Sequence, residues 1–169
     1  PSSAAASDSG VFGLPYREAQ STIVLIPVPW EATTSYRAGT AAGPEAILKA
    51  SRQVDLFDLD VLKPYEAGIF WQPVSPQIAA LAARARTLAL PVVEAGGALT
   101  PALQEVAGSV NAASRELNTW VYEQTKGILS AGKIAAVVGG DHSCPYGAFK
   151  AASEHFPSFG LLHFDAHSD

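Results

Sequence analysis

Three potential metal ligands, Asp165, His167 and Asp169, occupy alternate positions in the sequence DAHSD. In an extended strand such residues share one face, so their two carboxylates and one imidazole would point the same way. This donor set suits Mn²⁺, Ni²⁺, Co²⁺, Fe²⁺ or Zn²⁺ better than Ca²⁺ or Mg²⁺, which prefer oxygen ligands. Two carboxylates held so close repel each other unless a cation lies between them. The pattern predicts a metal site, and the alternative is a solvated acidic turn with His167 as a passive neighbour.

A second polar motif, GGDHS at residues 139–143, follows another apolar run. Its two glycines permit close backbone approach at a strand end. Asp141 is placed to orient a nearby imidazole or to be held by backbone amides. The alternative is a glycine turn that leads into a helix capped by Asp141 or Ser143. One helix and one strand separate the two motifs, so they are expected on neighbouring strands.

Helical patterns separate the apolar runs that carry these motifs. Strands are predicted at residues 22–28, 134–138 and 159–164, and helices from Pro44, over 101–130 and over 145–155. Between them, residues 76–90 look helical, residues 91–97 resemble a short extended piece with a turn, and residues 54–61 suggest a short strand. This alternation predicts an α/β fold with a parallel sheet and helices on both faces. Sites in such sheets form outside the carboxyl ends of the strands.

Composition narrows the function classes. The 169 residues are 48% hydrophobic and 16% charged, with a net charge of −5 and no cluster of Lys or Arg, which argues against nucleic acid or a membrane as partner. The single cysteine, Cys144, cannot form an internal disulfide, so we expect a reducing, cytoplasmic location. The run Ile23–Val28 is too short to span a bilayer, and no basic segment of a signal peptide precedes it.

With a third stretch, the two motifs resemble the ureohydrolase family of arginases and agmatinases. That stretch, PWEATTSYRAGTAAGPEAILKAS at residues 29–51, is closer to the agmatinase type. It departs from the usual agmatinase pattern in its Pro-Val-Pro-Trp turn and at Ala38 and Ala41. The resemblance covers about residues 20–169. It implies residues 21–169 as the N-terminal part of a single ureohydrolase-type domain. Residues 1–20, which begin with the small polar stretch PSSAAASDSG, are expected to form a flexible N-terminal arm.

The resemblance also implies a binuclear metal centre, with Mn²⁺ as the first expectation and Ni²⁺ as the second. His142 would ligate one metal ion, His167 the other, and Asp165 would bridge both. Asp169 would bind the same ion as His142 and accept a hydrogen bond from the metal-bridging hydroxide. That hydroxide would attack a guanidinium carbon, which makes His142 and Asp169 the expected catalytic residues. Asp141 and Ser143 would support these ligands.

The family's arginase-like three-layer αβα sheet is about twice this size. Two further aspartate ligands and a glutamate that contacts guanidinium come from downstream in that family. We therefore expect the chain to be an N-terminal portion, inactive by itself, that needs a C-terminal remainder of the same protein. Asp55, Asp58 and Asp60 are expected to form an exposed edge rather than to replace the missing ligands. A homo-oligomer, a trimer or a hexamer, is expected from the resemblance.

Agmatine is the first expectation for the substrate, followed by guanidine, guanidinobutyrate and arginine. The alternatives are a deacetylase-like hydrolase with one zinc ion and an inactive ureohydrolase-like subunit. Several single residues have simpler interpretations. His163 is expected to be a core histidine, His155 a surface histidine at a helix end, and Cys144 a packed residue. Trp30 and Tyr36 either pack or form a wall of the substrate entrance.

Overall fold

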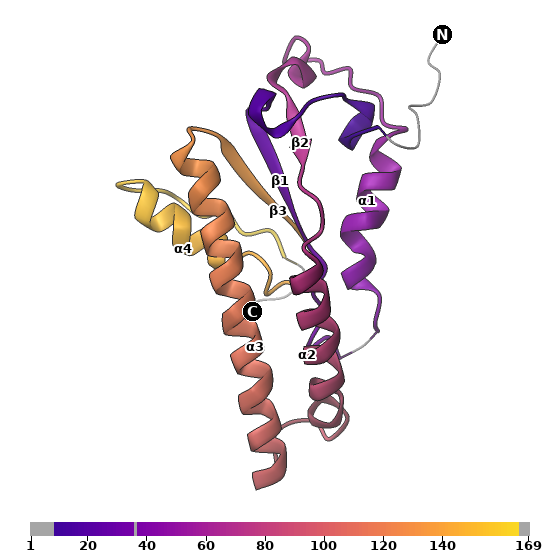
Figure 1. The fold of residues 1–169 in the computed structure, drawn as a ribbon, viewed down its shortest axis with the longest axis vertical. Helices are drawn as coiled ribbons and strands as arrows, with labels where there is room; N and C mark the ends of the chain where they lie inside the picture. Colours follow the sequence, from indigo (N-terminus) through magenta and orange to yellow (C-terminus); the bar gives the residue numbers. More distant parts are fainter. Residues whose placement is uncertain (1–8, 36, 166–169) are drawn as a thin grey trace.

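The computed structural model describes residues 9–35 and 37–165 (Figure 1). Its centre is a parallel sheet of β1 (Ile23–Val28), β2 (Ile69–Trp71) and β3 (Ile134–Gly139), in the order β2-β1-β3. Along β1 and β3 the register runs from Ile23 opposite Ile134 to Val28 opposite Gly139. The carboxyl ends of these two strands therefore lie side by side. The predicted parallel α/β architecture is confirmed.

Four α-helices accompany the sheet in the described part of the chain: α1 (Gly43–Ser51), α2 (Pro76–Glu94), α3 (Pro101–Ser130) and α4 (Tyr146–His155). Short 3-10 turns cover Val11–Gly13, Glu18–Gln20, Thr40–Ala42 and Pro64–Ala67. The two long helices begin in the same way, with a capping hydroxyl followed by proline. Ser75 Oγ accepts a hydrogen bond from the amide of Ile78, and Thr100 Oγ1 accepts one from the amide of Leu103. These caps satisfy amides that have no partner within the helix.

The strand order explains why helices cover both faces. The connection from β1 to β2 and the connection from β2 to β3 run in opposite directions across the sheet. If both crossovers are right-handed, their helices must lie on opposite faces. Figure 1 shows α1 on one side of the strands and α3 with α4 on the other. Helices α3 and α4 also pack closely against each other.

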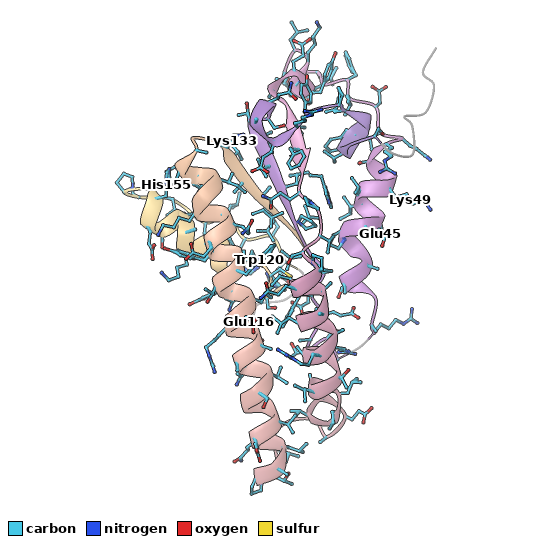
Figure 2. All side chains as sticks on the ribbon, in the orientation of Figure 1. Glu45, Lys49, Glu116, Trp120, Lys133 and His155 are labelled. Carbon is cyan, nitrogen blue, oxygen red and sulfur yellow. The ribbon has the colours of Figure 1, made fainter. Side chains whose placement is uncertain are left out.

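The hydrophobic core lies between β1 and the long helices. Val24, Ile26 and Val28 of β1 are fully buried in one cluster with Ile78, Leu81 and Ala85 of α2. Helix α3 buries the face that its 3–4 spacing predicted, namely Val110, Ala113, Leu117, Val121 and Ile128. The opposite surfaces carry charge: Glu45 and Lys49 are exposed one turn apart on α1 (Figure 2). Buried apolar faces of the two long helices, α2 and α3, therefore hold the sheet in place.

Substitution of Leu117 tests this packing directly, because only 1% of the residue's surface is exposed. We expect Leu117→Ala to lower the free energy of unfolding by about 3 kcal/mol, through lost burial and the cavity that remains. Urea denaturation followed by circular dichroism measures the change. The control is Leu99→Ala, because Leu99 is 75% exposed just before α3, and we expect a change within about 0.5 kcal/mol. Equal effects of the two substitutions would contradict this core.

The predicted strand at residues 54–61 is wrong. This segment forms turns, because Asp55 Oδ1 accepts the amide of Phe57 and Asp58 Oδ1 accepts the amides of Asp60 and Val61. Aspartate side chains that bond to nearby amides compete with strand pairing. The segment borders an open hollow of about 800 Å³, whose lining includes Phe57 and Leu62 but no histidine. As predicted, its three aspartates are exposed.

The predicted strand at residues 159–164 is also wrong in the described structure. The chain there has no sheet pairing, and Leu161, Leu162 and Phe164 are exposed. A continuous apolar run stays in a strand only where neighbouring strands pair with it and both its faces are covered. None of the described residues provides that cover. The segment instead returns from α4 toward the carboxyl end of β3 (Figure 1).

Two further segments differ from expectation. Residues 91–94 continue α2 as helix instead of forming an extended piece, although the predicted turn follows, with Gly96 at a φ of 71°. Pro91 lies in the last turn of the helix, where it removes the hydrogen bond that a residue 91 amide would donate to the carbonyl of Thr87. At the N-terminus, residues 9–20 contact the fold: Val11 is buried and the amide of Phe12 donates to Ser51 Oγ. The earlier part of the expected arm, residues 1–8, lies outside the described residues.

No helix in the described part of the chain is long and apolar enough to cross a membrane.

The expected surface histidine is confirmed: His155 is the exposed last residue of α4. Its ring packs edge to face on Phe156, with the ring centroids 4.7 Å apart (Figure 2). A cation at this position interacts favourably with the carbonyl end of a helix.

Candidate metal centre

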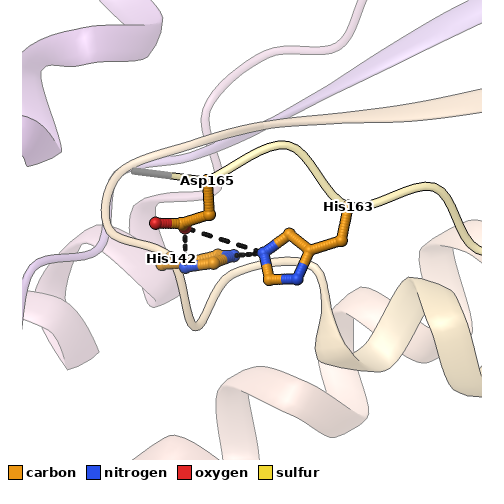
Figure 3. Close-up of side chains that lie close together, drawn as sticks. All are labelled: His142, His163 and Asp165. Atoms are coloured by element: carbon orange, nitrogen blue, oxygen red, sulfur yellow. Dashed lines mark hydrogen bonds and ion pairs between the residues drawn. The ribbon is translucent and has the colours of Figure 1, made fainter. Parts of the chain in front are cut away.

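Three side chains converge beyond the carboxyl end of β3: His142, His163 and Asp165 (Figure 3). His142 Nδ1 lies 2.8 Å from Asp165 Oδ2. His163 Nε2 lies 3.1 Å from His142 Nε2 and 3.6 Å from Asp165 Oδ2. One ligand atom from each residue falls within 4.8 Å of the others. Within residues 9–35 and 37–165 this is the one group of three such side chains with that geometry.

The cluster is open to solvent on the histidine side. The side chains of His142 and His163 are 49% and 48% exposed, whereas that of Asp165 is 17% exposed. The Asp165 side chain is thus the least exposed of the three, although all three residues lie at the surface of the described structure.

Packing against β1 positions the loop that carries His142. The amide of Asp141 donates to the carbonyl of Trp30 over 2.8 Å, and the amide of Trp30 donates to Val28. Gly140 lies so close to Trp30 that a Cβ there would stand 2.1 Å from the Trp30 carbonyl oxygen. Trp30 itself is only 1% exposed, so of its two interpretations packing is the one observed. Its predicted companion Tyr36 lies outside the described residues.

Asp141 and Ser143 stabilise the turn between β3 and α4. Asp141 Oδ1 accepts hydrogen bonds from the backbone amide of Ser143, at 3.0 Å, and from its hydroxyl, at 2.6 Å. This contact matches the expectation that backbone amides hold Asp141. Its second oxygen, Oδ2, is buried and has no donor among the described residues. A buried carboxylate oxygen beside His142 adds negative charge that favours a cation nearby.

Cys144 is the packed residue that the sequence predicted. It is buried, and its Sγ lies 3.8 Å from the carbonyl of Val28. Burial, together with the negative charge of Asp141, raises the pKa of the Cys144 thiol to about 12. The thiolate is the reactive form of cysteine, so this residue is a poor nucleophile.

We expect alkylation of Cys144 by iodoacetamide at pH 8 to be about a thousand-fold slower in the folded than in the unfolded protein. With a pKa of about 12 instead of the ordinary 9.0, the thiolate fraction falls by about that factor. The raised pKa also predicts that the contribution of Cys144 to stability is constant below pH 9 and is lost as the pH rises from about 9 to 12, because only the unfolded state ionises there. Mass spectrometry of the alkylated protein measures the rate. Equal rates with and without urea would contradict the burial.

The loop after β1 is held by two charged residues. Glu31 Oε2 accepts the amides of Gly39, at 2.6 Å, and Ala41, at 3.1 Å. Burial opposes ionisation of Glu31, but these hydrogen bonds outweigh it and leave the pKa of the carboxyl below its usual value. Arg86 of α2 reaches across and donates to the carbonyl of Thr34 over 2.7 Å. These contacts hold the described parts of the loop, around Thr34 and around Gly39, in place.

The structure brings together part of the predicted ligand set. His142 and Asp165, which come from two different motifs, are in contact. His167 and Asp169 lie outside the described residues. The prediction that His163 is a core histidine is wrong, because its ring is half exposed and points at His142. The signal that was available is its position two residues before Asp165, which puts it on the same face as the predicted ligands in an extended chain.

The donor set fits a divalent cation. Imidazole nitrogens and carboxylate oxygens are ligands that Mn²⁺, Ni²⁺ and Zn²⁺ accept, and those of His142 and Asp165 lie close enough here to share one ion. His142 and Asp165 would hold it. Two of the three groups come from one short segment and the third from the loop after β3, so binding would tie that segment to the sheet.

Comparison with known proteins identifies one family, with relatives that match most of the chain. The model of the arginase family matches residues 21–169. An N(1)-aminopropylagmatine ureohydrolase of Thermus thermophilus is 32% identical over 163 residues, which cover 94% of this chain and 44% of the relative. An agmatinase of Klebsiella pneumoniae is 30% identical over 157 residues, 92% of this chain and 42% of the relative. The chain thus spans less than half the length of these relatives. No solved structure gives a significant match.

Proposed function

The chain belongs to the arginase family, and from that premise we propose that it is the N-terminal portion of a metal-dependent amidinohydrolase. The whole protein would hydrolyse a guanidino compound to urea and an amine. The observation that carries the proposal is the contact between His142 of GGDHS and Asp165 of DAHSD, with nitrogen and oxygen 2.8 Å apart. His142 and Asp165 are 23 positions apart in the sequence, and their contact supports one shared cluster.

A guanidinium group is a cation and a poor electrophile, so its hydrolysis needs a strong nucleophile at neutral pH. A pair of divalent ions supplies water with a lowered pKa. In this chain His142, Asp165, His167 and Asp169 would hold the ions, with Mn²⁺ as the first choice and Ni²⁺ as the second. Asp169 would accept a hydrogen bond from the attacking nucleophile. The carboxylates of Asp165 and Asp169 offset positive charge, so that a cationic substrate is not repelled.

The proposed ligand set is incomplete within this chain. We propose that a C-terminal remainder of the same protein adds further carboxylates and contacts the substrate. The relatives are more than twice as long as the matched region, which leaves room for that remainder. On this proposal the 169-residue chain binds metal weakly and is inactive by itself. A cytoplasmic homo-oligomer, trimeric or hexameric, is part of the same proposal.

Agmatine, or an agmatine that carries a substituent, is our first choice of substrate. The sequence at residues 29–51 resembles agmatinases, and relatives of the chain are named for agmatine and for N(1)-aminopropylagmatine. A guanidine hydrolase or another guanidino-acid ureohydrolase is the alternative. An inactive family member is the non-enzymatic alternative. Membership in the arginase family leaves the deacetylase-like alternative without support.

The test is urea release by the complete protein, loaded separately with Mn²⁺ and with Ni²⁺. Agmatine, N(1)-aminopropylagmatine, 4-guanidinobutyrate and free guanidinium form the substrate panel, and metal-stripped protein is the control. We expect turnover of agmatine or its aminopropyl derivative with metal only. Turnover of guanidinium or guanidinobutyrate alone would shift the assignment to the alternative enzyme. No urea from any substrate by metal-loaded protein would support the inactive subunit.

A further inference from the structure

His142 is held at both of its ring nitrogens. Nδ1 lies 2.8 Å from Asp165 Oδ2, and Nε2 lies 3.1 Å from Nε2 of His163 (Figure 3). The two imidazole rings are tilted by 57° with centroids 4.9 Å apart, so they meet through their nitrogen edges and not by stacking. His163 is therefore in hydrogen-bonding contact with Nε2 of His142, and the same His163 nitrogen lies 3.6 Å from Asp165 Oδ2, so the three groups form one compact cluster.

Packing does not fix the His142 ring, because about half of its side chain is exposed. An exposed imidazole rotates about its Cβ–Cγ bond, and the terminal torsion of histidine has no sharp minimum. Polar contacts at its two nitrogens therefore contribute to the orientation of the ring. Asp165 supplies one of these contacts and His163 supplies the other.

The contact also constrains where His142 carries its proton. A neutral imidazole has one nitrogen that donates and one that accepts. A cation bound through Nδ1 takes that lone pair, which leaves the proton on Nε2. Nε2 then needs an acceptor, and His163 Nε2 lies within reach of it. Metal-binding histidines generally donate their other N–H to such a partner, which fixes the tautomer and the ring orientation.

We propose that His163 is a positioning residue for the metal centre: it receives the Nε2 proton of His142 and so directs Nδ1 toward the ion. This inference rests on the proposed function. It also assigns His163 a role other than direct ligation. A ring nitrogen that accepts this hydrogen bond has no lone pair left for a metal ion, and His163 Nε2 is the atom that faces His142.

The first experiment measures Mn²⁺ affinity by calorimetry in the complete protein and three variants. His163→Phe keeps a ring but removes the acceptor, and we expect it to weaken Mn²⁺ binding about 10–100-fold. His163→Gln restores a polar atom near the Nε2 position, and we expect affinity within a few-fold of wild type. His155→Phe is the matched control, an exposed histidine at the end of α4, and should not change the affinity. Wild-type affinity in His163→Phe would overturn the proposal.

A spectroscopic readout separates positioning from ligation. Two-bond ¹H–¹⁵N spectra of the Zn²⁺-loaded protein, labelled at histidine, should show His142 bound through Nδ1 and protonated at Nε2. His163 should show no metal-bound nitrogen. A metal-bound nitrogen on His163 would make it a ligand, and a proton on Nδ1 of His142 would reverse the tautomer; either result overturns the proposal.

If the proposed function is wrong, the metal-binding measurement on the wild-type protein gives a different result. If wild-type protein binds neither Mn²⁺ nor Zn²⁺, the metal-dependent function is wrong, and the contact is then judged from the metal-free spectra. His163→Phe should shift the ring resonances of His142, whereas His155→Phe should leave them in place. Unchanged His142 resonances in both variants would overturn the positioning role as well.

Discussion

Asp165→Asn is expected to reduce urea release by the complete protein about a thousand-fold or more. Asp165 is the least exposed member of the cluster, and its Oδ2 approaches both His142 and His163. An amide is uncharged and a weaker ligand, so the centre would lose both affinity and the charge that balances its ions. Loss of several kcal/mol of transition-state stabilisation corresponds to that factor in rate. Metal content by elemental analysis should fall together with the rate.

Asp60→Asn is the matched control, because Asp60 lies exposed in the turn segment 54–61, remote in sequence from the cluster. It makes the same chemical change, and we expect wild-type rate and metal content. Circular dichroism of both variants checks that the fold is retained. An Asp165→Asn protein that keeps full metal content and full activity would exclude Asp165 from the centre.

Gly140→Ala is expected to lower the free energy of unfolding by about 2–6 kcal/mol and to weaken metal binding at the same time. The added Cβ would stand 2.1 Å from the carbonyl oxygen and 2.7 Å from the amide nitrogen of Trp30. Both are backbone atoms at the end of β1, so the loop must move, which breaks the hydrogen bond from the Asp141 amide to Trp30. Overpacking and a lost buried hydrogen bond each cost about 1–3 kcal/mol. His142 follows two residues later and would be displaced.

Gly160→Ala provides the comparison, since a Cβ at Gly160 would meet no atom within 4 Å. It makes the same substitution in the segment that leads to Asp165. Urea denaturation and Mn²⁺ calorimetry measure both variants in the complete protein. We expect Gly160→Ala to behave as wild type, and a Gly140→Ala protein of unchanged stability would contradict the close approach of the loop to Trp30.

Elements with a strong internal period were predictable from sequence. The helix at Pro101–Ser130 and its buried face follow from apolar residues at helical spacing, with Thr100 and Pro101 marking the start. The strand at Ile134–Gly139 follows from a β-branched run closed by glycines. In these segments local propensity and tertiary packing favour the same structure, so a pattern of a few residues is sufficient.

Elements that depend on a partner were not predictable in the same way. The run from Phe159 to Phe164 has strand composition, but it pairs with no described strand. The segment 54–61 alternates apolar and acidic residues, yet Asp55 and Asp58 bond to nearby amides and turn the chain. Strand propensity reflects how well side chains pack against adjacent strands, and a single sequence does not show which strands are adjacent.

The candidate site likewise contains one contact that the sequence predicted and others that it did not. The motifs predicted that His142 and Asp165 would meet, because both follow the carboxyl ends of predicted parallel strands. The contact of His163 with His142 was missed, because a histidine inside a predicted strand looks like a core residue. The contact from Arg86 to the loop after β1 was also missed. It joins residues more than 50 positions apart, and no local pattern reports such a pair.

Anomalous diffraction from crystals of the complete protein grown with Mn²⁺ tests the central claim most directly. We predict a Mn²⁺ peak at bonding distance, about 2 Å, from both His142 Nδ1 and Asp165 Oδ2, with a second peak that shares Asp165. Crystals in Mn²⁺ that show no peak at this cluster, with His142 bonded to Asp165 alone, would contradict the claim that the two motifs form a metal centre.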